Sequence, residues 1–149
     1  MNTPINENEH VRFGAALGTR RMAPGFVEHD LPAKRLGAPT HTHVHEDEWS
    51  YVVSGTLTAQ IGDDILRAGP GELVHKPKGV PHAMWNAGDE PVRFLEVIQP
   101  AGFEEYFFEL AEPLNAGDFE RVGEIMARYG LDLDFESMPR LIAEHGLEA

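Results

Sequence analysis

Short apolar segments separated by glycine and proline fill the first two-thirds of the chain, and no long helical period occurs before residue 100. Two of these segments flank Gly55 and predict strands that meet at a turn. A hairpin is expected around Gly62-Asp63-Asp64. Many short strands with regular turn signals are typical of a β-sandwich or barrel. The expected strands cover residues 49–54, 56–61, 72–75 and 92–98.

The last third of the chain follows a helical period instead. Apolar side chains recur every three or four positions through residues 103–114 and 119–129, which predicts two helices. Asp118 is expected to cap the second helix and Gly130 to end it, and a third short helix is expected after Ser137. We expect these helices to pack their apolar faces against the β-rich part. The alternative is a lid, or an arm exchanged between two chains.

Length and charge restrict the class of protein. A chain of 149 residues favours one domain, with a barrel at about 11–100 and a helical C-terminal extension at about 101–149. The 12 Lys and Arg against 25 Asp and Glu leave a net charge of −13, which argues against nucleic acid or an anionic membrane as partner. The absence of cysteine excludes disulfides, thiolate zinc sites and cysteine nucleophiles. The N-terminus has no apolar segment, so a cytoplasmic protein is expected.

A cluster of histidines and carboxylates predicts a metal site. His41 and His43 would share one face of a strand, because alternate side chains of a strand point the same way. Glu48 lies an odd number of positions from His43, so it can join them only if the chain turns through residues 45–47. That turn would place His45 and its two acidic neighbours near solvent. His45 is therefore expected to be a turn residue, although a substitute ligand or proton shuttle is the alternative.

The spacing of these residues resembles the two motifs of the cupin superfamily. In the first motif a His-x-His pair is followed by Glu after four residues and by Gly after six more, as in His41, His43, Glu48 and Gly55. The second motif, Gly-x5-Pro-x-Gly-x2-His-x3-Asn, fits Gly71, Pro77, Gly79, His82 and Asn86 at every spacing. One departure is the glycine that usually precedes the first histidine: Arg35 stands at its place. The resemblance covers roughly residues 37–98.

This resemblance implies an all-β-dominated fold, a double-stranded β-helix (jelly-roll) barrel with the metal inside. The family's ligands correspond to His41, His43, Glu48 and His82. Three imidazoles and a carboxylate suit one divalent transition metal ion: Fe, Mn, Ni, Co, Cu or Zn. The resemblance to family members of this size also implies that the protein is a homodimer. The segments 45–55, 100–107 and 127–130 are similar to small bacterial monocupins related to quercetin dioxygenases.

The expected function is a dioxygenase-like, metal-dependent enzyme for a small enol-, enediol- or flavonol-like substrate. Glu48 would be both a metal ligand and the catalytic acid/base. Two alternatives stay open: a non-oxidative isomerase or lyase with a Lewis-acid metal, and a non-catalytic cupin that only binds a small molecule.

Other side chains have weaker assignments. His75 could line the substrate pocket or lie satisfied in the barrel wall. Tyr51, Trp85 and Phe94, like Trp49, are expected to fill the barrel, and some of them could shape an apolar pocket. The residues expected at the surface are His10, His29, His145, Glu104, Glu105 and Glu148.

Overall fold

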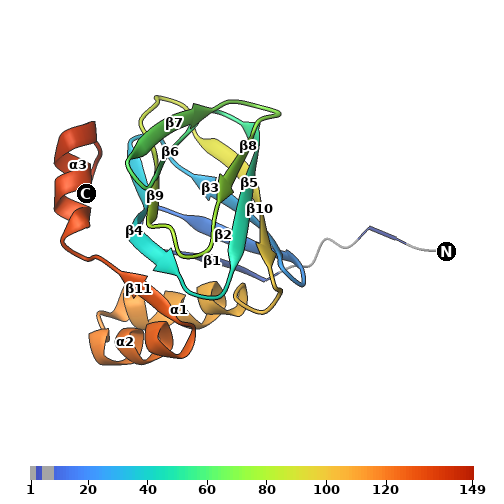
Figure 1. The fold of residues 1–149 in the computed structure, drawn as a ribbon, viewed down its shortest axis with the longest axis vertical. Helices are drawn as coiled ribbons and strands as arrows, with labels where there is room; N and C mark the ends of the chain where they lie inside the picture. Colours follow the sequence, from blue (N-terminus) through green and yellow to red (C-terminus); the bar gives the residue numbers. More distant parts are fainter. Residues whose placement is uncertain (1–2, 5–8) are drawn as a thin grey trace.

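Two antiparallel β-sheets face each other and form a barrel in the computed structural model, which describes residues 3–4 and 9–149 (Figure 1). One sheet has the strand order β1 (His10–Arg12), β2 (Gly18–Ala23), β3 (Phe26–Leu31), β10 (Val92–Gln99), β5 (Asp47–Ser54) and β8 (Leu73–Lys76). The other has the order β11 (Leu131–Leu133), β4 (Arg35–His43), β9 (His82–Asn86), β6 (Leu57–Ile61) and β7 (Asp64–Ala68). The predicted jelly-roll class is therefore confirmed.

The strands predicted from the alternating segments are present within one or two residues of their expected ends. The hairpin around Gly62 joins β6 to β7 as expected. At Gly55, however, the chain does not fold back on itself but passes from one sheet to the other, because β5 and β6 belong to different sheets. Gly55 has φ +78°, and a Cβ atom there would lie 2.4 Å from the carbonyl oxygen of Pro91. Only glycine therefore fits this crossing.

The barrel core lies between the two sheets. Alternate residues of β5 and β10 point inward, so that Val52 and Phe94 are fully buried and lie opposite each other in the β5–β10 register. The core cluster of buried residues is Leu17, Leu31, Val52, Leu57, Ala59, Ala68, Val74, Met84, Val92 and Phe94.

The C-terminal extension contains the three predicted helices, α1 (Glu105–Ala116), α2 (Phe119–Arg128) and α3 (Ser137–His145). The Asp118 side chain caps α2 by accepting the backbone N–H of Arg121 at 3.3 Å, and Gly130 takes φ +65° just after the helix, as expected. Helices α1 and α2 lie together at one end of the barrel, while α3 lies along its side (Figure 1). Among the described residues, no helix is long and apolar enough to cross a membrane.

The helices are joined to the barrel by packing and by a strand. Ile98 of β10 shares a buried cluster with the helical residues Tyr106, Leu110, Val122 and Ile125. Between α2 and α3 the chain adds β11 to the edge of β4, where Leu131 pairs with His43. The extension therefore supports the strand that carries the histidine pair.

Glu104 was expected in solvent, and this expectation is wrong. The side chain is 3% exposed, and its carboxylate accepts the backbone N–H groups of Gly25 and Gly102. Glu104 thus ties the start of α1 to the turn between β2 and β3, and these hydrogen bonds offset the loss of its hydration. Its neighbour Glu105 is exposed, as expected, and pairs with Arg21.

Candidate metal centre

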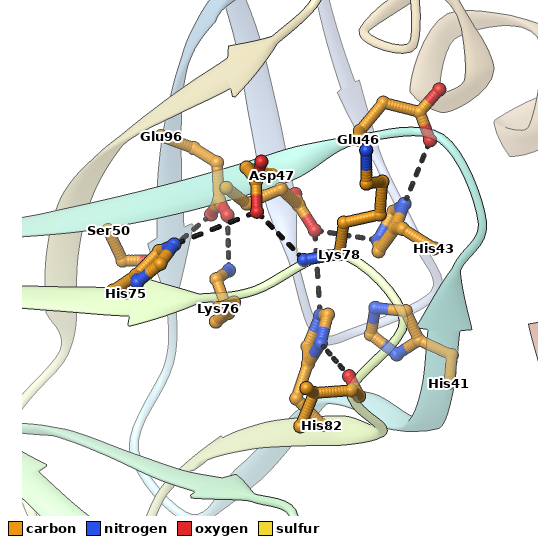
Figure 2. A network of polar contacts seen from close by, with 12 residues as sticks. His41, His43, Glu46, Asp47, Ser50, His75, Lys76, Lys78, His82 and Glu96 are labelled. Carbon is orange, nitrogen blue, oxygen red and sulfur yellow. Dashed lines mark hydrogen bonds and ion pairs between the residues drawn. The ribbon is translucent and has the colours of Figure 1, made fainter.

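The four predicted ligands come from three strands in the two sheets. His41 and His43 stand two positions apart on β4, and His82 opens β9 as the register partner of His41. Glu48 lies on β5, in the facing sheet. The chain turns between the end of β4 at His43 and the start of β5 at Asp47, as the odd spacing requires. Glu48 is thereby brought back toward the histidines, of which His41, His43 and His82 are seen close together in Figure 2.

Their side chains form one buried group whose ligand atoms all lie within 4.8 Å of one another. The Oε1 atom of Glu48 is 2.6 Å from His43 Nε2 and 3.5 Å from His82 Nε2. The ring centroids of His41 and His82 are 4.2 Å apart. Among the described residues, neither Glu48 Oε1 nor His82 Nε2 has a hydrogen-bond partner. Since buried polar atoms are rarely left unpaired, this donor set fits a transition metal ion.

The second ring nitrogen of each histidine faces an oxygen behind it. The Nδ1 atoms of His41 and His82 lie 2.7 Å and 3.3 Å from a backbone carbonyl two residues earlier. His43 Nδ1 is 3.6 Å from Glu46 Oε1, which is too far for a hydrogen bond, and neither atom has a hydrogen-bond partner among the described residues. In His41 and His82, an N–H on Nδ1 that donates to the carbonyl leaves the lone pair on Nε2, in the arrangement typical of metal-ligating imidazoles.

Burial and charge keep these groups in the protonation states that bind a metal. Burial, together with the neighbouring His82 and His43, holds the pKa of His41 well below its ordinary value, and burial also lowers the pKa of His82. Burial alone would raise the pKa of Glu48. The Lys76 ammonium and His43 outweigh it and hold that pKa well below its usual range. His41 and His82 are therefore held as neutral imidazoles and Glu48 as an ionised carboxylate, the forms that bind a metal.

The position of Glu46 differs from the expectation of a solvent-facing turn. Its side chain is 8% exposed and turns inward to His43 Nδ1, whereas His45 beside it is exposed. The turn is tight, so the Glu46 carboxylate lies close to the ring of His43, which is three positions earlier in the chain. Burial raises the pKa of Glu46, and the nearby His43 and His45 oppose this rise. His45 is a turn residue, as predicted.

The loop of the second motif is attached to the first motif. Gly79 donates its backbone N–H to the carbonyl of His43 at 2.9 Å, and the backbone N–H of Lys78 donates to Asp47 Oδ1 at 2.8 Å. Asn86, the last motif residue, is buried and donates to the backbone carbonyl of Glu90 at 2.8 Å. The loop before His82 therefore has a defined position relative to the β4–β5 turn.

The family model of the cupin domain matches residues 27–98, which contain the four predicted ligands and strands from both sheets of the barrel. These residues form a cupin domain. No curated protein matches the sequence significantly.

Solved structures share the cupin fold at low sequence identity. A sugar phosphate isomerase of the cupin superfamily from Silicibacter pomeroyi DSS-3 is 23% identical over 56% of this chain and 59% of its own, with a TM-score of 0.51. A predicted oxalate decarboxylase from Thermotoga maritima is 18% identical over 66% of this chain and 97% of its own, with a TM-score of 0.58. An oxalate decarboxylase from Lactobacillus farciminis is 19% identical over 64% of this chain and 32% of its own, with a TM-score of 0.54.

A cavity of about 510 Å³ adjoins the ligand group inside the cupin barrel. His41, His43 and Glu48 form part of its wall, and the helical extension closes another part. The Phe103 ring lies 4.5 Å from the His43 ring, centroid to centroid. The apolar lining includes Phe13, Leu17, Met84, Phe103, Tyr106, Phe107, Leu110, Leu114, Val122 and Met126. The volume is in the range that binds small organic molecules.

Four further residues were candidates for substrate contact, and none of them lines this cavity. Tyr51 is 43% exposed, and the exposed His75 stacks on Trp49 with ring centroids 5.0 Å apart. Phe94 is fully buried in the barrel core, as expected. Trp85 is also buried, but in a cluster with Leu141 of α3, so it packs outside the main core. The His145 ring stacks on Trp85 at 4.2 Å.

Three buried polar residues of the cavity were missed: His29, Lys76 and Glu96. His29 was expected at the surface, and this expectation is wrong, because its side chain is 0% exposed. The alternation of side chains along the strand indicates that His29 is buried, because His29 shares a face with Val27 and Leu31, which are both buried. Glu96 alternates in the same way with buried residues of β10, and Lys76 lies opposite Glu48 on β8.

Proposed function

We propose that this cupin is a metal-dependent enzyme that acts on a small enol-, enediol- or flavonol-like molecule by dioxygenase-type chemistry. One observation carries the proposal: of a group of three imidazoles and one carboxylate, His41, His43 and Glu48 lie in the wall of a mostly apolar cavity. Such a cavity with a few convergent polar groups is the usual form of a small-molecule site.

The metal would be held by His41, His43 and His82 through Nε2 and by Glu48 through its carboxylate. A bound divalent transition metal ion supplies open coordination positions and Lewis acidity and, where it is redox-active, the means to use dioxygen. The two sheets fix the four side chains from opposite sides, since β4 and β9 carry the histidines and β5 carries Glu48. The geometry of the group therefore depends on the barrel and not on a mobile loop.

Glu48 is the residue placed to move a proton. Its Oε1 atom is buried and has no hydrogen-bond partner within the described part of the chain. Its lowered pKa keeps it ionised, so it can accept the proton of a substrate hydroxyl and return it later. An enol or enediol has such a hydroxyl next to the carbon framework that reacts.

The apolar side of the cavity favours a substrate with an apolar body. Phe103, Tyr106 and Phe107 come from the start of the helical extension and line the cavity together. Their rings exclude water from the reacting group and offer faces and edges to an aromatic molecule. A strongly hydrated substrate would lose its hydration in this cavity without regaining hydrogen bonds.

The first experiment is metal analysis of the untagged protein, followed by oxygen uptake with 3-hydroxyflavone, an enediol and a 1,3-diketone. We expect about one redox-active ion per chain, from the single ligand group, and oxygen consumption with at least one substrate. Glu48→Gln should abolish turnover, whereas His45→Ala should retain it. No oxygen uptake with any of the three classes would contradict the dioxygenase proposal. Product formed equally without oxygen would favour a non-oxidative isomerase or lyase, and binding without any product a non-catalytic cupin.

A further inference from the structure

A second polar cluster lies inside the barrel beside the metal-ligand group. Lys76 and Glu96 are 3% and 1% exposed, and the Lys76 ammonium donates to Glu96 Oε1. The Ser50 hydroxyl donates to Glu96 Oε2 at 3.2 Å. Figure 2 shows Ser50, Lys76 and Glu96 together on the side of the view away from His41 and His43. A buried ion pair is costly to desolvate, and a barrel core does not require one. The Lys76–Glu96 pair is therefore a candidate for a functional role.

His29 on β3 faces this cluster in a fixed orientation. Its Nδ1 atom lies 2.9 Å from the Thr19 hydroxyl, and its ring packs between the rings of Phe94 and Phe107, each 5.1 Å away between centroids. Its Nε2 atom is 3.5 Å from Glu96 Oε2 and has no hydrogen-bond partner among the described residues. An unpaired buried nitrogen is destabilising, and native proteins seldom retain one without a use.

The same cavity connects His29 with the ligand group. His29, Lys76 and Glu96 line it together with His41, His43 and Glu48, while most other lining side chains are apolar. A molecule in the cavity thus meets one polar region at the ligand group and a second at His29. Among common oxygen functions, a hydroxyl satisfies this second region best. It can donate to Nε2 or accept from it, whichever nitrogen of His29 carries the hydrogen, and it can also donate to Glu96.

We propose that His29 is a substrate-binding residue whose Nε2 hydrogen-bonds a hydroxyl group of the molecule in the cavity. The proposal rests on the proposed function in assigning this molecule as the substrate. The Lys76–Glu96 pair is a positioning element, because it holds the carboxylate that faces His29. The hydroxyl at His29 would orient the substrate, so that its reacting oxygen lies at the ligand group.

The test is binding of 2-naphthol and naphthalene to the full-length, metal-stripped protein, measured by fluorescence titration. The two probes share an apolar body and differ in one hydroxyl. We expect 2-naphthol to bind roughly three- to tenfold more tightly, the range of one net hydrogen bond. His29→Leu should abolish this preference with little change for naphthalene. The control His75→Leu, on the outer face of the barrel, should retain the preference.

A second variant tests whether a lost preference in His29→Leu is caused by misfolding. His29→Gln keeps an amide close to the position of Nε2 and should restore part of the preference for 2-naphthol. Metal content after reconstitution should be the same in wild type, His29→Leu and His29→Gln, because His29 is not a ligand. A preference that persists in His29→Leu overturns the proposal, as does the absence of saturable 2-naphthol binding to wild type. Because the protein is metal-free and no turnover is measured, failure of the dioxygenase proposal leaves this result unaffected.

Discussion

The buried, neutral state of His29 predicts a specific dependence of stability on pH. Burial and, as the second cause, the Lys76 ammonium lower the pKa of His29 to about 3, whereas the unfolded chain has the ordinary value of 6.5. The folded pKa is below the unfolded one, so the unfolded state binds the extra proton. The stability that His29 contributes is therefore complete above pH 6.5 and is lost progressively as the pH falls from 6.5 toward 3.

The size of the loss follows from the two pKa values. Between pH 7.5 and pH 5.5, His29 in the unfolded chain goes from mostly neutral to about nine-tenths protonated, while folded His29 stays neutral. The free energy of unfolding should therefore fall by about 1.4 kcal/mol through this residue alone. The loss is a large fraction of the stability of a small domain, so it is measurable.

The assay compares urea unfolding of wild type and His29→Leu at pH 7.5 and pH 5.5, both stripped of metal. Every other titrating group is present in both proteins, but Glu96 lies 3.5 Å from His29 and burial raises its pKa to about 8, so the substitution also changes its titration. The difference between the two pH dependences therefore reports His29 together with Glu96. Wild type should lose about 1.4 kcal/mol more than the variant between the two pH values. His75→Leu, the exposed control, should follow wild type. Equal losses in wild type and His29→Leu would refute the burial argument.

Three further predictions concern the metal site and the extension. His41→Ala should lose most of the bound metal in elemental analysis, and His45→Ala should keep it; the reverse result would mean that the ligand strand is wrongly placed. Glu46→Gln should weaken metal affinity roughly tenfold in a chelator competition, because the carboxylate behind His43 Nδ1 supports its ligating tautomer; unchanged affinity would show that Glu46 has no such role. Removal of residues 103–149 should cause aggregation or a large loss of stability in light scattering and thermal melts, because the apolar residues packed under the helices become exposed; a soluble and active truncation would contradict this.

Local sequence was sufficient for the His41–His43 pair, the turn to Glu48 and the helices, whereas His82 was expected from the resemblance to the cupin motifs. The parity of a strand places His41 and His43 on one face, and the odd step to Glu48 requires the turn that the structure shows. The 3.6-residue period locates the helices, and Asp118 marks the start of the second. These features depend on residues a few positions apart. Over that distance the backbone geometry of a helix or strand fixes the direction in which each side chain points.

The second polar cluster was decided only by tertiary structure. Strand parity can show that His29 or Glu96 shares a face with apolar neighbours, but not that the two side chains meet 3.5 Å apart. That contact depends on the pairing of β3 with β10, which are more than 60 residues apart in the chain. The same holds for Lys76, which stays charged inside the barrel only because Glu96 and Glu48 raise its pKa against the effect of burial.

The sequence, with its resemblance to the cupin motifs, therefore predicted the barrel class, the four candidate ligands and the helical extension. Only the tertiary structure decided which polar side chains are buried, where the cavity lies and which residues the extension covers. The physical reason is that burying a polar group is unfavourable unless a partner satisfies it, and here the partners come from distant strands. Spacing along the chain determines the direction of side chains within one helix or strand. The register between strands determines which side chains come into contact.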